Sequence, residues 1–301
     1  MEQKIVHLIE EKGPRTGSEI LDVLGGPGLA VWRACSVSDR LEVRSVGSRY
    51  LRLDQKVEGF ARLSPSILRE FMTYTVVGLA GDAEALDRRA EMILQHIRQV
   101  SESKRMLAQG IVAGLRGSLG DVWPPETRIC FLIAGDIVYG MAHDVPRPEH
   151  STGKMVKGSD MDLIVISEDG VSHDFLKELD RAIYQEKYRT LIMPALKEEI
   201  DYVVKNMERV REQLRFDTFK RMVACKILQE GELLAGSQSL FDEIKSLLVH
   251  CGVSEKLQEM EGRARRFRQR AEEYLLRTHP ACVTKEDLHL FYTREESEEF
   301  E

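Results

Sequence analysis

The alternation of apolar and polar residues over the first 55 positions predicts three short helices followed by two strands. Apolar residues recur at helical spacing in residues 3–13, 18–26 and 29–39. Residues 41–54 instead alternate apolar and polar positions on both sides of the Val-Gly-Ser-Arg sequence at 46–49. This pattern is typical of a β-hairpin with its turn at 46–49.

Three short helices before a hairpin resemble a winged helix-turn-helix domain, which we expect at residues 1–55. Between Val31 and Lys56 six basic residues outnumber three acidic ones. The excess would lie on the third helix and the wing, the usual nucleic-acid face of such a domain. The candidate contacts are Arg33, Arg40, Arg44, Arg49 and Arg52. A protein-binding or purely structural winged helix fits the same pattern, so both interpretations stay open.

Residues 56–121 are expected to form a helical linker. Ser64 has the character of a helix N-cap and Pro65 fits the first helical position, so the stretch 64–118 is predicted to be entirely helical. The helical period continues from about Asp82 to Leu119. A helix of this length could connect two domains.

The stretch 122–235 carries the residues with candidate chemistry. An apolar strand at 128–134 ends at a turn, Gly135-Asp136, that leads into a short helix. A polar loop then precedes a second strand at 160–166, and a third strand is predicted at 200–204. Residues two apart on a strand point to the same face, so Asp160 and Asp162 project together. Asp201 would join them if the third strand lies beside the second.

Three carboxylates this close repel one another and raise each other's pKa unless a cation neutralises them. Mg²⁺ prefers carboxylate and phosphate oxygens as ligands. Two such ions clamp the attacking and leaving oxygens of an in-line phosphoryl transfer. The three aspartates therefore predict a site for Mg²⁺ or Mn²⁺ that acts on a phosphate, with a capping or calcium-like carboxylate pair as the alternative.

An apolar strand, a Gly turn, a helix and then Gly-Ser-Asp-Met-Asp-Leu before aliphatic residues resemble the nucleotidyltransferase superfamily related to DNA polymerase β. The resemblance covers about residues 126–235 and implies an α+β domain, a mixed sheet with flanking helices, at 122–235. It implies that Asp160 and Asp162 bind two metal ions, and that Asp201 joins one of them near the attacking group. It also implies that Gly135 lets the backbone approach the triphosphate of ATP or another NTP.

Two features depart from the family pattern. Position 136 is Asp where the family usually has Ser, and the loop before the second strand is longer than in minimal members. Asp136 could be a further metal ligand, could face away, or could mark a degenerate nucleotide site. Lys154 and Lys157 in the loop are candidates to restore phosphate affinity, and Ser159 is a candidate to supply the missing hydroxyl.

The C-terminal region, residues 236–301, is expected to be helical and to end in an acidic tail. Its most unusual feature is a run of five arginines within eight residues, namely Arg263, Arg265, Arg266, Arg268 and Arg270. At helical spacing they spread over more than half of the helix circumference. Two interpretations remain open. The helix either binds nucleic acid or an acceptor, or its arginines form ion pairs within the helix.

Composition narrows the setting in which these motifs act. The net charge of -7 and pI of about 5.7 argue against nonspecific coating of nucleic acid. Five scattered cysteines without a metal-like spacing are typical of reduced thiols in a cytosol. The N-terminus lacks the pattern of a signal peptide, and no apolar run approaches the roughly 20 residues that span a bilayer. We therefore expect a cytoplasmic protein that does not enter a membrane.

Two functions follow from these features. In the first, the protein is a metal-dependent nucleotidyltransferase that moves a nucleotide from an NTP onto an RNA end, a protein or a small molecule. In the second, it is a DNA-binding regulator whose nucleotidyltransferase-like domain senses a nucleotide or has lost activity. The three aspartates favour the first function, and Asp136 favours the second.

Overall fold

The computed structural model describes residues 1–120, 123, 128–149, 151–293 and 296. The chain forms two compact units. Unit 1 combines Met1–Ile97 with Met260–Glu301, and unit 2 comprises Arg98–Glu259. Helices and small sheets occur in both units, which confirms the α+β class expected from the sequence.

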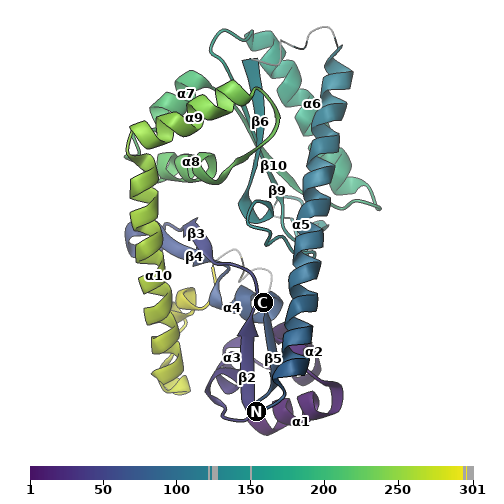
Figure 1. Ribbon diagram of the computed structural model, residues 1–301, viewed down its shortest axis with the longest axis vertical. Helices are drawn as coiled ribbons and strands as arrows, with labels where there is room; N and C mark the ends of the chain where they lie inside the picture. The colour runs from purple at the N-terminus through teal and green to yellow at the C-terminus, as the bar shows by residue number, and fades with distance from the viewer. Residues whose placement is uncertain (121–122, 124–127, 150, 294–295, 297–301) are drawn as a thin grey trace. The chain divides into compact units, whose positions relative to one another are not determined.

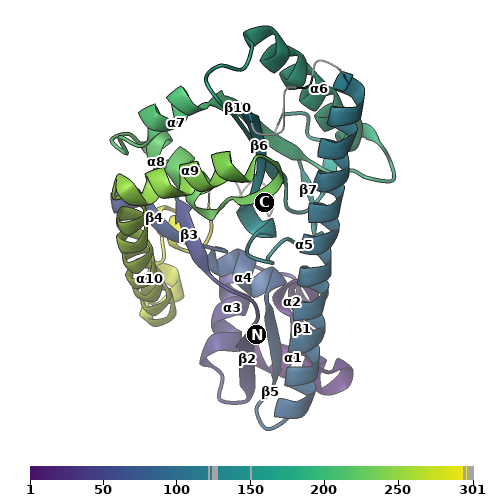
Figure 2. The same cartoon turned by 45° about the horizontal axis from the view of Figure 1, so that its top comes forward.

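Unit 1 places helices around a small antiparallel sheet (Figure 2). Its helices are α1 (Glu2–Lys12), α2 (Gly17–Leu24), α3 (Gly28–Val37), α4 (Ile67–Thr73), the start of α5 (Ala83–Leu119) and the end of α10 (Val253–Arg277). Its strands are β1 (Arg15–Thr16), β2 (Leu41–Ser45), β3 (Tyr50–Leu53), β4 (Ala61–Ser64) and β5 (Thr75–Leu79). Short 3-10 turns occur at η1 (Glu58–Phe60), η5 (Pro280–Cys282) and η6 (Glu286–Leu290).

The core of unit 1 joins segments that are far apart in the sequence. Ile5 and Ile9 of α1, Phe71 of α4 and Val77 of β5 pack in one buried cluster with Leu275 of α10. The C-terminal segment is therefore part of the hydrophobic core that the N-terminal segment begins.

The hairpin predicted at residues 41–54 is wrong. Both strands form, but β2 pairs with β5 and β3 pairs with β4, all antiparallel. Val76 and Val77 on β5 are both fully buried, so β5 is the central strand of the order β1-β5-β2. Burying both faces of β5 stabilises the fold more than a short local hairpin would, because the stabilising free energy grows with the apolar area removed from water.

The expectation of an entirely helical stretch from 64 to 118 is also wrong. Strand β5 interrupts it, because Thr75, Val76 and Val77 are β-branched residues that favour a strand. Helix α4 begins at Ile67 with Ser66 as its N-cap, in place of Ser64. The long helix predicted from about residue 82 to 119 is confirmed as α5, which continues from unit 1 into unit 2.

Unit 2 is built on a four-stranded sheet of order β10-β9-β6-β11. Its strands are β6 (Ile129–Ala134), β7 (Pro146–Pro148), β8 (Met155–Lys157), β9 (Met161–Ser167), β10 (Ile200–Asn206) and β11 (Glu232–Gly236), with β7 and β8 forming a separate hairpin. Its helices are α6 (His173–Ile192), α7 (Met207–Gln213), α8 (Phe219–Glu230) and α9 (Gln238–His250), together with η4 (Gly135–Ile137) and parts of α5 and α10.

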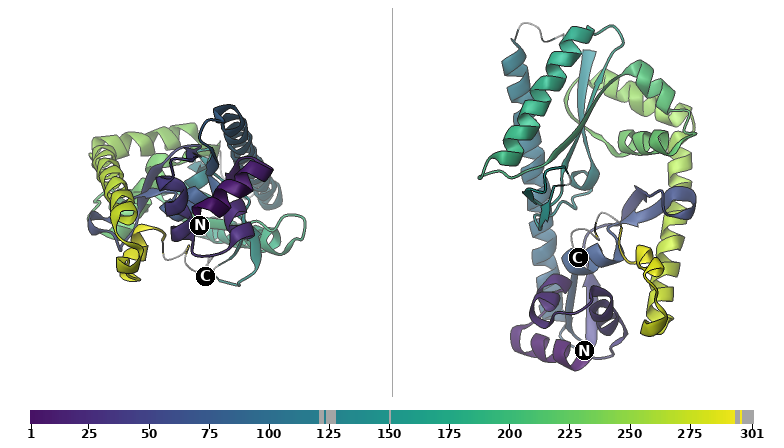
Figure 3. Two further views of the ribbon diagram at one scale, coloured as in Figure 1. Left: turned by 90° about the horizontal axis from the view of Figure 1, so that it is seen from below. Right: turned by 180° about the vertical axis from the view of Figure 1, so that it is seen from behind.

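Helices cover the sheet of unit 2 on two sides. Figures 1 and 3 show α5 and α6 on one side of the strands and α8 and α9 on the other. Ile111 and Leu115 of α5 pack with Phe131 of β6, Leu163 of β9 and Leu179 of α6 in one cluster. This burial fixes the strands whose ends carry the aspartates.

Helix α8 gives way to an edge strand of the sheet. Helix α8 ends at Glu230, and the residues after Gly231 form β11, which pairs with β6 in antiparallel register. Gly231 favours the end of a helix, and the edge of the sheet provides hydrogen-bond partners for the strand that follows.

Among the described residues no single helix is both long and apolar enough to span a membrane. Helices α2 and α3 meet that criterion only when they are taken together, across a bend of 118°.

Candidate active site

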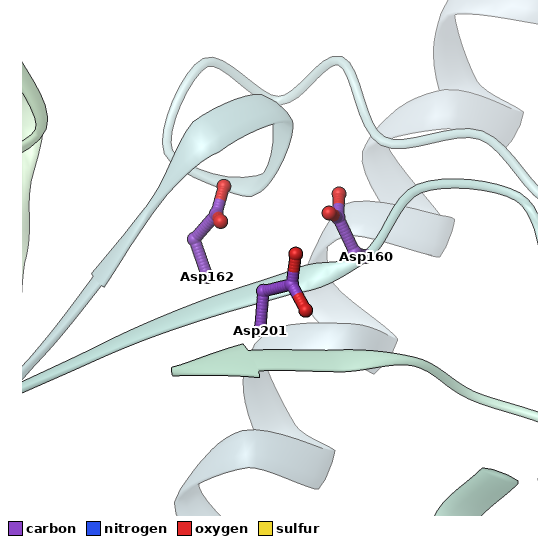
Figure 4. Close-up of side chains that lie close together, drawn as sticks. All are labelled: Asp160, Asp162 and Asp201. Atoms are coloured by element: carbon purple, nitrogen blue, oxygen red, sulfur yellow. The ribbon is translucent and has the colours of Figure 1, made fainter. Parts of the chain in front are cut away.

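Two neighbouring strands of unit 2 bring three carboxylates together. Strands β9 and β10 are parallel, and their register places Asp201 directly beside Asp162. Asp160 lies just before β9, two residues from Asp162. One oxygen from each carboxylate lies within 4.8 Å of the other two, and Figure 4 shows the three groups converging. The adjacency of the second and third predicted strands is thus confirmed.

Burial makes the charged forms of two of these acids costly. Burial raises the pKa of Asp162 well above its usual value, and Asp160, Asp201 and Glu230 raise it further. Burial also raises the pKa of Asp160, the Arg147 guanidinium opposes the shift, and other acids add to it. The site therefore gathers more negative charge than its own cations neutralise.

Gly135 leaves room for the Asp162 carboxylate at the end of β6. Ala134 pairs with Asp162 across β6 and β9, and the chain then turns at Gly135 with φ +73°. A Cβ atom at Gly135 would lie 2.2 Å from Oδ2 of Asp162. The turn therefore requires glycine for its conformation and for its contact.

Asp136 and Ser159 are joined by a hydrogen bond. Ser159 is buried, and its hydroxyl donates to Oδ2 of Asp136 at 2.7 Å while accepting from the backbone N–H of His143 at 3.2 Å. The Asp136 carboxylate is outside the group of three that converge, and its charge raises the pKa of Asp160 and Asp162. The hydroxyl of Ser159 is thus already engaged by the acid that departs from the family pattern.

The two loop lysines contact the region around α6. Nζ of Lys154 lies 5.6 Å from the centre of the Tyr188 ring. Nζ of Lys157 donates to the carbonyl oxygen of Ala195 at 3.1 Å. Both lysines are exposed, so their contacts leave them accessible to solvent.

Two cations near the cluster were not predicted from the sequence. Nζ of Lys187, on α6, lies 2.9 Å from Oδ1 of Asp201. Arg147, on β7, is buried, donates to the carbonyl oxygen of Gly158 at 2.8 Å and pairs with Glu199 at 2.9 Å. Only the packing of α6 and of the β7–β8 hairpin brings these side chains to the aspartates, so no local pattern identifies them.

The arginines predicted to contact nucleic acid mostly contact unit 1 itself. Arg33 donates to the carbonyl oxygen of Leu276 at 3.1 Å. Three others form ion pairs, which are Arg40 with Glu10 (3.2 Å), Arg44 with Glu42 (2.7 Å) and Arg49 with Glu70 (2.8 Å). Arg52 lies on β3 and is half-buried. Much of the positive charge predicted for residues 31–56 is therefore neutralised locally.

No protein-family model matches the chain, and no curated protein matches it. A solved structure described as "Crystal structure of the toxin-antitoxin with AMP-PNP" is similar at 18% sequence identity and a TM-score of 0.24, covering 56% of this chain and 98% of that one. A TM-score this low does not establish a common fold. The function is therefore inferred from the geometry of the chain itself.

Proposed function

We propose that the protein is a metal-dependent nucleotidyltransferase whose catalytic site is the cluster of Asp160, Asp162 and Asp201. The observation that carries this proposal is the convergence of three carboxylates from neighbouring strands within 4.8 Å, in surroundings that raise the pKa of two of them. Gathering repelling acids costs stability, and a bound divalent cation offsets that cost. The resemblance of this segment to the nucleotidyltransferase superfamily supports the same reaction.

The donor set fits Mg²⁺ or Mn²⁺, because all three groups are carboxylates. Asp160, Asp162 and Asp201 would hold the ions, and the family resemblance implies two of them. Divalent ions bound there would polarise the phosphoryl group and neutralise the charge that develops on it during transfer.

The chain's own residues take distinct roles in this proposal. The side chain of Asp201 is 52% exposed, so it is the carboxylate of the three that an acceptor hydroxyl reaches most easily. We assign to it the orientation of the attacking group and the acceptance of its proton. The absence of a side chain at Gly135 leaves room for the Asp162 carboxylate, and we assign to the backbone of this turn the contact with the phosphates of the donor NTP.

A second candidate function is a nucleotide sensor without transfer activity. Asp136 supports it, because this carboxylate adds negative charge where the family usually has a hydroxyl. Nucleotide binding without transfer would separate the sensor from the enzyme. The DNA-binding role of residues 1–55 remains part of this second candidate.

The test is transfer of α-labelled ATP, GTP, CTP and UTP, with Mg²⁺ or Mn²⁺, onto RNA, protein and small-molecule fractions of a cell extract. The wild type is compared with Asp160→Ala plus Asp162→Ala, and Asp174→Ala on the exposed first turn of α6 is the control. We expect label with the wild type and the control only. NTP binding without label in any fraction would favour the sensor, and absence of both would contradict both candidates.

A further inference from the structure

Unit 1 contains a cavity of about 850 Å³ with a strongly basic lining. The second half of α10 forms one wall, residues 56–61 form another, and η6 closes a third side. Figures 1 and 3 show α10 running beside β3 and β4, the strands that flank residues 56–61. The lining includes Lys56, Arg263, Arg266 and Arg270 against one acid, Glu58.

The structure divides the five arginines of α10 into two groups. Arg265 pairs with Glu261 on the exposed side of the helix. Arg268 is buried, where it pairs with Glu70 and donates to the carbonyl oxygen of Pro65 at 2.8 Å. The contacts of these two side chains agree with the interpretation of the cluster as part of a helix held by ion pairs.

The other three arginines line the cavity. Arg263, Arg266 and Arg270 follow each other at spacings of three and four residues, so they share one face of α10. Together with Lys56 they are exposed, and their side chains make no hydrogen bond or ion pair with any described residue. Four cations gathered without a partner among the residues that the structure describes repel one another, and an anionic ligand would relieve that repulsion.

The spacing of the cations favours a strand over a single nucleotide. A rise of about 1.5 Å per residue separates Arg263 from Arg270 by about 10 Å along the helix, a length over which a nucleic-acid strand presents more than one phosphate. Aromatic side chains lie among the cations, because Phe267 and Tyr274 also line the cavity. Tyr274 is 39% exposed, so its ring is available for stacking.

We propose that this cavity binds single-stranded nucleic acid. Lys56, Arg263, Arg266 and Arg270 contact successive phosphates, and Tyr274 stacks on a base. A basic groove combined with an aromatic platform is the arrangement that binds single strands with little sequence preference. The cavity lies in unit 1 and shares no residue with the carboxylate cluster of unit 2, and the proposal does not depend on the transfer reaction.

Fluorescence anisotropy with labelled RNA and DNA single strands of roughly 12 nucleotides tests the proposal on the full chain. The cavity variant carries Arg263→Gln, Arg266→Gln and Arg270→Gln. The control variant carries Lys12→Gln, Arg265→Gln and Arg277→Gln, three exposed positions of unit 1 outside the cavity lining. Both variants lose the same charge, and their thermal unfolding is compared with that of the wild type.

We expect the cavity variant to bind roughly tenfold or more weakly, and its plot of log affinity against log salt to flatten by about 0.7 for each lost phosphate contact. The control variant should bind like the wild type. Tyr274→Leu should weaken binding about fivefold or more, because it removes one stacking platform. Equal binding by the cavity and control variants would overturn the proposal.

Two further measurements identify the ligand and the site. ATP should displace the labelled strand only at much higher concentrations than an unlabelled strand does. If ATP and the unlabelled strand displace it at the same concentration, the assignment to a strand is overturned. The variant with Asp160→Ala and Asp162→Ala should bind the strand like the wild type, and a loss would move the binding site to the carboxylate cluster. Strand binding without nucleotidyl transfer would leave this inference standing while the proposed function fails.

Discussion

Gly135 shows how one missing side chain determines what the site can hold. With alanine there, the Cβ atom would lie 2.2 Å from Oδ2 of Asp162, and φ would remain +73°. We expect Gly135→Ala to displace the Asp162 carboxylate, to lower Mn²⁺ affinity and transfer, and to cost about 1–3 kcal/mol of unfolding free energy.

Gly140→Ala is the matched control for this prediction. Gly140 also has a positive φ, +62°, but a Cβ atom there meets nothing within 4 Å. The Gly140→Ala variant should lose about 1 kcal/mol of unfolding free energy, which is the cost of the left-handed conformation, and should keep its metal affinity. Mn²⁺ titration and urea unfolding measure both effects, and equal metal affinity in the two variants would contradict the role of Gly135.

In the proposed metal site, Lys187 would compete with the ion for Asp201. Its Nζ lies 2.9 Å from Oδ1 of that residue, so it neutralises one of the three carboxylates. We expect Lys187→Met to tighten Mg²⁺ binding by about three- to tenfold, since a partly exposed ion pair of this kind is worth about 1 kcal/mol. Isothermal titration calorimetry measures the change. Weaker binding in Lys187→Met would show instead that the lysine holds Asp201 in position.

At the scale of elements, Glu149 closes the loop between β7 and β8. Burial alone raises the pKa of Glu149, but hydrogen bonds from the hydroxyl and backbone groups of Ser151 and Thr152 lower it to about 2. A lowered pKa means that the carboxylate stabilises the folded state above its usual pKa and that this contribution is lost as pH falls toward 2.

We therefore expect Glu149→Gln to be less stable than the wild type by about 2 kcal/mol at pH 7, and by less at pH 3. Urea unfolding at the two pH values measures the difference. A difference that does not change with pH would contradict an ionised Glu149 as the loop's hydrogen-bond acceptor.

Helix α10 depends on Arg268 for its attachment to unit 1. This buried guanidinium joins Glu70 of α4, Glu272 of its own helix and the Pro65 carbonyl. Arg268→Met leaves Glu70 with fewer partners in a buried position, so we expect a loss of about 3 kcal/mol. Arg265→Gln on the exposed side should change the unfolding free energy by less than about 1 kcal/mol. Similar losses in both variants would contradict this division of the cluster.

At the scale of the whole molecule, metal binding and stability should be linked through pH. The raised pKa of Asp160 and of Asp162 means that the folded state binds more protons than the unfolded state above the usual aspartate pKa of about 4. The metal-free protein therefore loses stability as pH rises through that range.

A divalent ion replaces those protons, so its stabilising effect should grow with pH. We expect Mg²⁺ at 100 times its dissociation constant at pH 8 to add about 2.7 kcal/mol to the unfolding free energy at that pH. The same Mg²⁺ concentration should add less at pH 5, where protons compete for the carboxylates. In Asp160→Asn plus Asp162→Asn, the Mg²⁺ effect should disappear and the metal-free protein should be more stable at pH 8. Thermal unfolding with Mg²⁺ or EDTA measures this, and a Mg²⁺ effect that persists in the variant would place the ion elsewhere.

The sequence alone determined the local parts of the site. Apolar runs predicted strands at 128–134, 160–166 and 200–204, and the structure has them at 129–134, 161–167 and 200–206. The spacing of Asp160 and Asp162 placed both side chains on one side of the second strand. The helical period located α5. These features depend on residues near one another in the chain, where backbone geometry alone fixes the direction of each side chain.

Tertiary structure decided everything that depends on distant partners. It paired β2 with β5 and added β11 to the sheet, because buried area determines strand pairing more strongly than a local turn does. It brought Lys187 to Asp201, and it separated the arginines that line a cavity from those in ion pairs. It also joined residues 260–301 to the first 97. No short stretch of sequence encodes these contacts, since each depends on which distant surfaces are buried together.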